Sequence, residues 1–400
     1  MGNSPAVGGR APIHTFYSTR SWIEGNATQQ LEDVASLSGV KAVAGMPDLH
    51  PGKYGPVGCS ILADRIHPQL VGSDIGCGMG LFQLDLAVRK LRVDKAADRL
   101  RALDMPWEGD VAGAMAEAGL ATTPFDASLG TIGGGNHFCE LQAIEEIVEP
   151  EVAAHAGLDK AGAFVLVHSG SRGLGYAILQ AHLAAVGAMG SAGTAALDPH
   201  ADAGHAYLSR HDLAVRWAAL NRRIIALRAA EAARADCLAV ADLSHNLVEV
   251  TGNGVLHRKG TAPADRGLVP IPGSRGTLSY LVEPLASARP EALASLAHGA
   301  GRKYDRASMH GRIRTGKADR AELARNPFGG MIVCADRNLI VEEAPEAYKS
   351  IDRVIADLAD FGLARVVATF RPLVTFKTGK AGERRLGRDR RGQSDREERR

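Results

Sequence analysis

Short apolar runs bounded by glycine, proline or polar residues are the feature that most constrains the fold of this 400-residue chain. Runs of this length and setting predict β-strands. They occupy residues 163–167, 237–240, 267–271 and 331–335, and a close pair at 365–370 and 372–376. The loops after these runs are rich in glycine, so tight turns follow the strands.

Two longer segments carry apolar residues at helical spacing. Residues 208–235 and 348–361 both read as amphipathic helices, and Gly362 stops the second. The strands exclude an all-helical protein, and they do not alternate with helices as in a doubly wound sheet. We therefore expect one mixed α/β domain.

Composition excludes several classes of protein. No segment approaches the roughly 18 apolar residues of a membrane helix, and the N-terminus has no signal-peptide run, so we expect neither a membrane-spanning nor a secreted protein. The cysteines are odd in number and form no C-x-x-C pair, which predicts a reducing, cytoplasmic location without disulfides or a zinc ribbon. They are Cys59, Cys77, Cys139, Cys237 and Cys334.

The net charge of +2 is unevenly distributed. Residues 380–400 contain nine Lys/Arg and five Asp/Glu, which leaves the remaining chain at about −2. We expect residues 1–379 to form the domain and residues 380–400 a solvated, disordered basic tail with weak attraction for phosphate. Residues 187–204 are small and polar, and they form either a linker or a surface loop between helices.

The segment 71–80, "VGSDIGCGMG", sets Asp74 and Cys77 three residues apart among glycines. In an extended loop both side chains can turn toward one divalent ion. Alone, such a pair is more typical of a turn aspartate beside a buried cysteine.

Three histidines at element boundaries strengthen the metal interpretation. They are His137 in "GGGNHFCE", His168 after a predicted strand, and His245 in "LSHNLVEV". Thiolate, imidazole and carboxylate together suit zinc, manganese, iron or cobalt rather than calcium, and the residues do not choose among them. A single histidine of this kind is usually structural, so the hypothesis depends on the whole set.

A fourth histidine lies in a different loop, "AHGAGRKYDR". Small residues after His298 leave room for a large ligand, Arg302 offers a phosphate partner, and a neutral His298 imidazole can act as a nucleophile. The residues by themselves therefore indicate a metal centre beside a phosphate-binding loop.

Taken together, these motifs resemble the RtcB-type RNA ligases. The matching segments run in the family's order from residue 46 to residue 377, and several are long and chemically unusual. They read "MPDLHPGKYGPVGCSI", "VGSDIGCGMG", "GTIGGGNHFCE", "VLVHSGSRGLG", "SHN", "HRKG", "IPGSRGTLSY", "HGAGR", "YKSID" and "RPLVTFK".

The resemblance implies a single large domain of mixed and antiparallel sheets flanked by helices. It also implies a GTP- and manganese-dependent ligase that joins an RNA 3′-phosphate or 2′,3′-cyclic phosphate to a 5′-hydroxyl in RNA repair or tRNA splicing. Its partner is RNA with those ends and not a membrane, and the protein is expected to be a monomer.

The resemblance assigns roles to particular residues. Cys77 would bridge two Mn²⁺ ions, with Asp74 and His137 on one and His168 and His245 on the other. His298 would attack the α-phosphorus of GTP and carry GMP, while Asp48 would fix its tautomer. The other residues around the guanylate would be Asn136, Phe138, Glu140, Ser274, Gly299, Ala300, Tyr348 and Lys377.

Departures from the family pattern indicate a divergent, shorter branch. The interval between "SHN" and "HRKG" is short, which leaves the roles of Arg258 and Lys259 open. Near the nucleotide loop, three residues differ from those usual in the family, namely Tyr304, Asp305 and Arg275. Lys380 rivals Lys377 as the nucleotide lysine, and the altered loops favour RNA repair over tRNA splicing.

Two other functions stay open at this stage. A metal-dependent RNA phosphoesterase would use the same ligands to activate water. A binding protein with a relic site would hold RNA through the arginine-rich tail.

Overall fold

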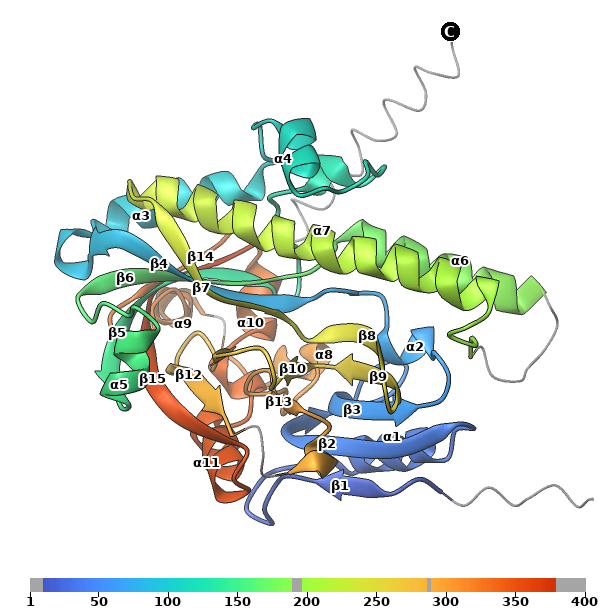
Figure 1. The fold of residues 1–400 in the computed structure, drawn as a ribbon. Coiled ribbons are helices and arrows are strands. Elements are labelled where there is room, and N and C mark those ends of the chain that lie inside the picture. The colour runs from blue at the N-terminus through green and yellow to red at the C-terminus, as the bar shows by residue number, and fades with distance from the viewer. Residues whose placement is uncertain (1–9, 189–195, 286–288, 315, 379–400) are drawn as a thin grey trace, which may run out of the picture.

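The computed structural model describes residues 10–188, 196–285, 289–314 and 316–378 (Figure 1). Its largest sheet has the strand order β11-β12-β15-β5-β6-β4-β7, with β14 beside β15. All neighbours pair antiparallel except β14 and β15. The strands are β4 (Gly78–Ala87), β5 (Phe138–Ile147), β6 (Gly162–Ser169), β7 (Cys237–Ser244), β11 (Val269–Ile271), β12 (Ser279–Pro284), β14 (Met331–Cys334) and β15 (Ala364–Lys377).

Two smaller sheets complete the β-structure. One has the order β1-β2-β3-β9-β8, and the other pairs β10 with β13. Their strands are β1 (Ile13–Thr15), β2 (Val40–His50), β3 (Val57–Ala63), β8 (Asn246–Thr251), β9 (Gly254–Lys259), β10 (Thr261–Pro263) and β13 (Ser295–Ala297). Together with the helices, these sheets confirm the expected mixed α/β class with mixed and antiparallel pairing.

Eleven α-helices lie in the described part of the chain. They are α1 (Gly25–Ala35), α2 (Pro68–Val71), α3 (Val93–Leu100), α4 (Val111–Glu117), α5 (Pro150–His155), α6 (Gly173–Ala188), α7 (Asp202–Ala233), α8 (Arg306–Met309), α9 (Lys317–Leu323), α10 (Arg337–Glu342) and α11 (Ile351–Asp360). No helix in the described ranges has the length and apolar character needed to cross a membrane.

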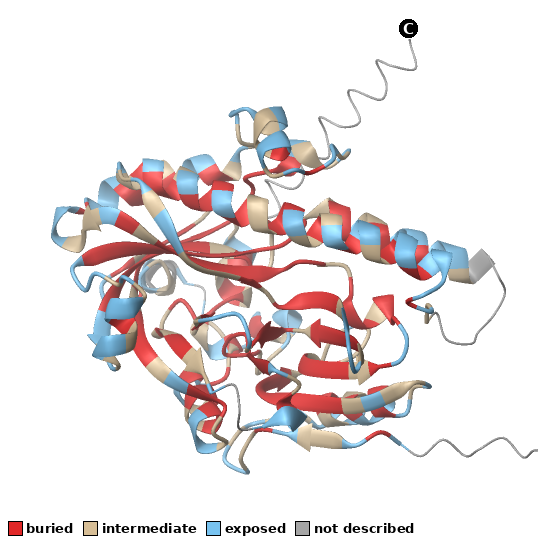
Figure 2. Ribbon diagram, viewed as in Figure 1, coloured by how far each residue is buried: buried red, intermediate tan, exposed pale blue. Residues whose placement is uncertain are grey.

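The core lies on both faces of the large sheet, which explains the continuous apolar run at residues 163–167. Val165 and Val167 of β6 pack with Ile225 and Ala226 of α7, on the face that α7 crosses (Figure 1). On the other face, Phe164 packs against β15. Every residue of β6 is buried, and Figure 2 shows buried residues along the sheet and on the inner side of α7. A strand covered on both faces needs no alternation of polar and apolar residues.

Most predicted elements are confirmed, with shifted ends. The first expected helix is α7, which begins six residues earlier. The second is α11, which begins at Ile351 because Ser350 caps it by accepting a hydrogen bond from the Arg353 N–H. Tyr348 stays extended and forms a bridge with Arg302 instead.

One strand prediction is wrong. The two runs at residues 365–370 and 372–376 belong to the single strand β15. Arg371, the residue between the two runs, and Pro372, which lacks an N–H, both pair with β5. The strand accommodates the proline with a register shift between Pro372 and Val374 against β5.

Two predicted segments fall wholly or partly outside the description. The basic tail at residues 380–400 lies outside the described residues, as do residues 189–195 of the segment 187–204. Of the described remainder, residues 187–188 belong to α6, residues 196–201 precede α7, and residues 202–204 begin α7.

Candidate active site

The register of the large sheet brings the predicted metal ligands to one edge. Cys77 precedes β4 and His137 precedes β5, whereas His168 lies near the end of β6 and His245 follows β7. Because β4 runs antiparallel to both β6 and β7, Gly78 pairs with Ser169 and with Ser244. Phe138 of β5 pairs with His168 in the same way. The starts of two strands and the ends of two others therefore meet.

The first group of candidate ligands contains Asp74, Cys77 and His137. Their ligand atoms lie within 4.8 Å of one another. The His137 Nε2 atom is 2.9 Å from the Asp74 carboxylate and 3.3 Å from the Cys77 sulfur. A Cβ atom at Gly170 would lie 2.1 Å from the Asp74 carboxylate, so only glycine leaves Asp74 this space.

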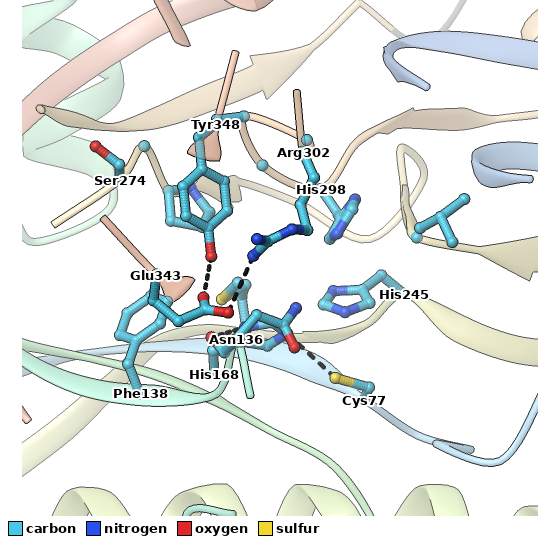
Figure 3. A pocket seen from close by; sticks show the side chains of 18 of the residues that line it. Cys77, Asn136, Phe138, His168, His245, Ser274, His298, Arg302, Glu343 and Tyr348 are labelled. Atoms are coloured by element: carbon cyan, nitrogen blue, oxygen red, sulfur yellow. Dashed lines mark hydrogen bonds and ion pairs between the residues drawn. The ribbon is translucent and has the colours of Figure 1, made fainter. Parts of the chain in front are cut away.

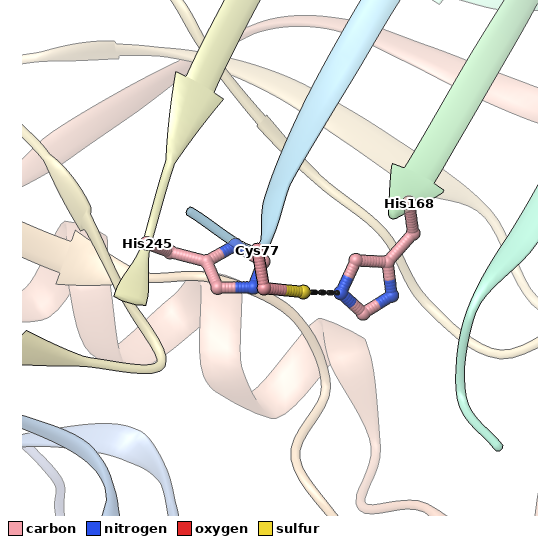
Figure 4. A group of neighbouring side chains, drawn as sticks. All are labelled: Cys77, His168 and His245. Atoms are coloured by element: carbon pink, nitrogen blue, oxygen red, sulfur yellow. Dashed lines mark hydrogen bonds between the residues drawn. The ribbon is translucent and has the colours of Figure 1, made fainter. Parts of the chain in front are cut away.

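The second group contains Cys77, His168 and His245, drawn in Figure 4, and it meets the same distance limit. The Cys77 sulfur lies 3.1 Å from His168 Nε2. His168 Nδ1 lies 3.2 Å from the Asn136 carbonyl, which leaves Nε2 to face the sulfur as a ligand. Cys77 is the member that the two groups share.

The protonation of these residues suits metal binding. Burial, followed by the positive charge of neighbouring imidazoles, lowers the pKa of His168 and His245 well below the ordinary value, so both keep a free lone pair. Burial favours the protonated form of Asp74, but His137 and more distant cations outweigh it and hold the pKa of Asp74 below its usual range.

The pKa of Cys77 moves in the opposite direction. Burial and the neighbouring Asp74 charge raise the pKa of this thiol well above its ordinary value. A thiolate at this position therefore requires a compensating positive charge, which a divalent cation supplies. Two groups of three ligands, each with positions left open, fit two such ions.

Arg222 of α7 holds the loops that carry these ligands. The side chain is 1% exposed. Its guanidinium donates to the Gly76 carbonyl at 2.7 Å and to the Ser169 carbonyl at 3.1 Å, next to Cys77 and His168 respectively. It also donates to the Ser244 hydroxyl, next to His245, at 3.3 Å. One buried side chain thus connects three of the ligand loops.

His298 and Asp48 form a buried pair beside the second ligand group. His298 Nδ1 is 2.6 Å from the Asp48 carboxylate, and the His298 backbone N–H donates to the same oxygen at 3.1 Å. With Nδ1–H held by the carboxylate, Nε2 carries the lone pair. The rings of His298 and His245 have centroids 4.6 Å apart. Gly301 permits the close approach, since a Cβ there would lie 2.2 Å from the Asp48 carbonyl oxygen.

Lys349 supports this pair, and sequence reasoning missed it. Its ammonium donates to the carbonyl oxygens of Leu49 and Pro47, on either side of Asp48. Burial lowers the pKa of Lys349 to about 8, while the Asp48 charge opposes the shift. The only sequence signal was its place in the "YKSID" motif.

All nine predicted nucleotide residues, His298 among them, line one cavity of about 350 Å³ (Figure 3). Asp74, Cys77, His168 and His245 line the same cavity, whereas His137 is not among the lining residues and is 6% exposed. The nucleotide residues are Asn136, Phe138, Glu140, Ser274, His298, Gly299, Ala300, Tyr348 and Lys377. The cavity thus unites the two chemical regions that the sequence set in separate loops.

Glu343 is a residue of this cavity that the sequence did not reveal. It is 2% exposed, and Figure 3 shows it accepting a hydrogen bond from the Tyr348 hydroxyl and pairing with Arg302. Arg306 lies 3.1 Å and Lys377 3.7 Å from its carboxylate. Burial opposes ionisation, but Lys377, Arg302 and Arg306 outweigh it and lower the pKa of Glu343 to about 2. In the sequence, nothing separates Glu343 from the neighbouring Glu342.

The other cationic residues that the sequence placed near the nucleotide differ in their contacts. Arg302 lines the cavity, but Glu343, the Glu342 carbonyl and the Tyr304 carbonyl accept from its guanidinium. Lys259 lines the cavity too and donates to the Val71 carbonyl at 2.6 Å. Arg258 turns instead to Glu249.

The remaining predictions about lysines and cysteines have mixed outcomes. Lys377 donates to the His137 carbonyl at 3.1 Å, whereas its rival Lys380 lies outside the described residues. Cys59 and Cys139 are buried, whereas Cys237 and Cys334 are partly exposed, and all four are free thiols, in agreement with the expected absence of disulfides among the described cysteines.

Comparisons with known proteins agree with this geometry. The model of a family described as "tRNA-splicing ligase RtcB" matches residues 30–105 and 107–378. The RNA-splicing ligase RtcB2 of Escherichia coli is 44% identical over 377 residues, which cover 92% of this chain and 97% of that protein.

More distant relatives also match over most of their length. The RNA-splicing ligase RtcB of Mycobacterium tuberculosis is 32% identical over 87% of this chain and 100% of its own. The tRNA-splicing ligase RtcB of Archaeoglobus fulgidus is 28% identical over 92% of this chain and 95% of its own. With the family model matched over most of its residues, the chain belongs to the RtcB family.

Proposed function

We propose that this chain is an RNA ligase that joins an RNA 3′-phosphate or 2′,3′-cyclic phosphate to a 5′-hydroxyl, using GTP and two Mn²⁺ ions. The observation that carries the proposal is the buried His298–Asp48 pair beside two ligand groups that share Cys77. The names of the relatives, RNA-splicing and tRNA-splicing ligases, support the substrate class.

In this proposal, Asp74, Cys77 and His137 hold one ion, and Cys77, His168 and His245 hold the other. When bound, the ions neutralise phosphate charge and polarise the reacting oxygens. The protein's own part is to supply neutral imidazoles and to fix their tautomers, as the Asn136 carbonyl does for His168.

His298 is the proposed nucleophile. Its Nε2 lone pair forms a bond to the α-phosphorus of GTP. The bond between that phosphorus and the oxygen that bridges to the β-phosphate breaks, and pyrophosphate leaves. The Asp48 carboxylate accepts a hydrogen bond from Nδ1–H and stabilises the positive charge that the ring acquires. The RNA 3′-phosphate then attacks the guanylate phosphorus, and the bond from that phosphorus to His298 Nε2 breaks. The 5′-hydroxyl attacks the 3′-phosphate activated in this way, loses its proton and displaces GMP as the phosphodiester forms.

The rest of the cavity surrounds the guanylate. Glu140 is 4% exposed, and its carboxylate can accept hydrogen bonds from a purine edge. Phe138 offers a ring face, and Lys377 offers a positive charge beside phosphate. We retain RNA repair as the proposed role and the cytoplasm as the proposed location, because the departures from the family pattern and the unpaired cysteines favour them.

The direct test is covalent guanylylation. Purified protein is incubated with Mn²⁺ and GTP radiolabelled at the α-phosphate, and protein-bound label is measured after denaturation. We expect labelling that His298→Ala abolishes and that His155→Ala, at an exposed position on α5, preserves. Absence of a His298-dependent label would sink the proposal.

A metal-dependent RNA phosphoesterase is the second candidate, because the open positions in both ligand groups could equally hold an activated water. An RNA pair with 3′-phosphate and 5′-hydroxyl ends separates the two functions. A ligase joins the ends only when GTP is present. A phosphoesterase releases inorganic phosphate and leaves the ends unjoined.

A further inference from the structure

A second cavity adjoins the one that contains His298. It measures about 750 Å³, and His50, Pro51, Arg302 and Arg306 line both cavities. Its remaining lining comes from two distant segments, residues 22–24 before α1 and residues 303–312 around α8. The shared residues make it an entrance to the proposed catalytic cavity.

Two aromatic rings face each other in this entrance. The rings of Trp22 and Tyr304 have centroids 6.3 Å apart and are tilted by 55°. Trp22 is 41% exposed, which is unusual for so large an apolar side chain. Tyr304 packs against a small buried cluster that includes Met309 and Val341, whereas Trp22 packs against none of the apolar clusters of the described residues. The exposed tryptophan face is therefore available to a planar ligand.

Positive charge lies directly beside the rings. The Arg312 guanidinium lies 3.8 Å from the centre of the Tyr304 ring, and the Lys303 ammonium lies 5.3 Å from it. In the part of the chain that the structure describes, neither of these cations is paired with a carboxylate. They therefore remain able to contact a phosphate.

The other charges of the entrance are largely compensated. Arg302 and Arg306 both pair with Glu343. Asp305 accepts from the Ser308 N–H at the start of α8. Glu24 is the remaining acid of the lining. The uncompensated cations of the entrance favour an anionic ligand, and its aromatic rings favour one with planar groups.

We propose that this entrance platform, formed by Trp22, Tyr304, Lys303 and Arg312, binds the unpaired end of an RNA strand. A base stacks on Trp22 and Tyr304, while Lys303 and Arg312 face the adjoining phosphates. Aromatic rings interleaved with cations are the usual means of holding single strands without sequence preference. The proposal rests on the function proposed above and narrows its substrate to ends with unpaired nucleotides.

The test separates RNA binding from guanylylation. Trp22→Ala and Tyr304→Ala are compared with Tyr176→Ala, which removes a still more exposed ring from α6, away from both cavities. Loss of one stacked base weakens binding roughly 5- to 100-fold. We expect the KM for RNA to rise by that factor in the first two variants and to stay unchanged in Tyr176→Ala. Trp22→Phe and Tyr304→Phe, which keep a ring, should restore most of the affinity.

Direct binding keeps the inference independent of catalysis. Titration with a fluorescein-labelled single strand should show the same loss in Trp22→Ala and Tyr304→Ala, even if no guanylate forms. Arg312→Gln should reduce the dependence of log K on log salt by about 0.7, the value for one phosphate contact to a single strand. Affinities equal to that of Tyr176→Ala would overturn the platform, whereas missing guanylate alone would overturn only the proposed function.

Abasic substrates identify which strand occupies the platform. One RNA lacks the base at the end of the 3′-phosphate strand, and another lacks it at the end of the 5′-hydroxyl strand. For the strand that stacks, removal of the base should weaken binding to the wild type. The wild type should then bind this abasic RNA no more tightly than Trp22→Ala does. If neither abasic end changes affinity, base stacking at this position is refuted.

Discussion

Cys77 shares its sulfur between two groups of candidate ligands, and this sharing gives one residue control over both. The other members belong to one group each. His168 and His245 are buried and neutral, whereas the Cys77 thiol needs a nearby cation to ionise. At the scale of single residues, the site thus combines ligands ready to bind with one that ionises only when metal is present.

Substitution of Cys77 should affect both ions together. We expect Cys77→Ala to reduce the bound Mn²⁺ from two ions per chain toward none. His137→Ala or His245→Ala should first weaken one ion only, because each removes a ligand from one group. Calorimetric titration of the purified variants with Mn²⁺ measures the stoichiometry. Equal losses in all three variants would contradict a bridging sulfur.

Glu140 predicts a dependence of stability on pH. Burial raises the pKa of this carboxyl from 4.5 to about 7, although hydrogen bonds from Thr375 and Gln142 oppose the shift. The unfolded chain therefore releases the proton at lower pH than the folded chain, and the free energy of unfolding falls as pH rises from about 4.5 to about 7. A shift of this size corresponds to about 3 kcal/mol.

Glu140→Gln should remove this fall in the free energy of unfolding with rising pH. In urea titrations without GTP, the stability of the variant relative to the wild type should increase by about 3 kcal/mol between pH 4.5 and 7.5. Glu146→Gln, at an exposed position of the same strand, serves as the control and should give a flat difference. A flat difference for Glu140→Gln would mean that Glu140 titrates normally.

At the scale of elements, the site depends on α7 and on the antiparallel register of β4, β6 and β7. The register aligns the ends of these strands, and α7 crosses the sheet with Arg222 directed at the loops beyond them. The loops are rich in glycine, and Ile75 and Ile132 pack two of them against the core. The positions of the loops are set by the pairing of the adjoining strands and by hydrogen bonds from Arg222.

Replacement of Arg222 should loosen the metal site without removing a ligand. Arg222→Lys keeps the charge but cannot reproduce the several directed hydrogen bonds of a guanidinium. We expect Mn²⁺ affinity to fall roughly 10- to 100-fold, as for other residues that orient ligands. Arg223→Lys, at the exposed neighbouring position, is the matched control. Unchanged Mn²⁺ affinity in Arg222→Lys, measured by calorimetry, would show that the loops hold their shape unaided.

At the scale of the whole molecule, the cavity lies where the large sheet, the β2–β3–β9 sheet and the "HGAGR" loop meet. Asp48 comes from β2, Cys77 from the start of β4, and His298 from the end of β13. Residues 250 positions apart thus form the His298–Asp48 pair. Ligand binding at this junction should therefore stabilise several parts of the fold together.

Mn²⁺ should raise the melting temperature of the protein. A ligand that binds only the folded state, at a free concentration 100 times its Kd, adds about 2.7 kcal/mol per site. We expect a shift of several degrees in differential scanning calorimetry, reversed by a chelator. Cys77→Ala should lose the shift. An equal shift in that variant would indicate that Mn²⁺ binds elsewhere.

Patterns in the sequence predicted much of the local structure and a set of candidate reactive residues. Apolar runs and helical spacing predicted β6, β7, α7 and α11, because these patterns depend on near neighbours. Asp74, Cys77 and the histidines stood out because reactive side chains in glycine loops have no packing role. The division of β15 into two runs was wrong because the sequence does not show that β5 accommodates Pro372 with a register shift.

Only the tertiary structure decided which of these residues meet and which charges are buried. Glu343 and Glu342 are adjacent and chemically alike, yet packing buries Glu343 among cations and lowers its pKa to about 2. The rings of Trp22 and Tyr304 lie side by side although the two residues are 282 positions apart in the chain. The physical reason is that strand register, burial and desolvation arise from contacts between distant segments, whereas a sequence pattern reports only what lies nearby.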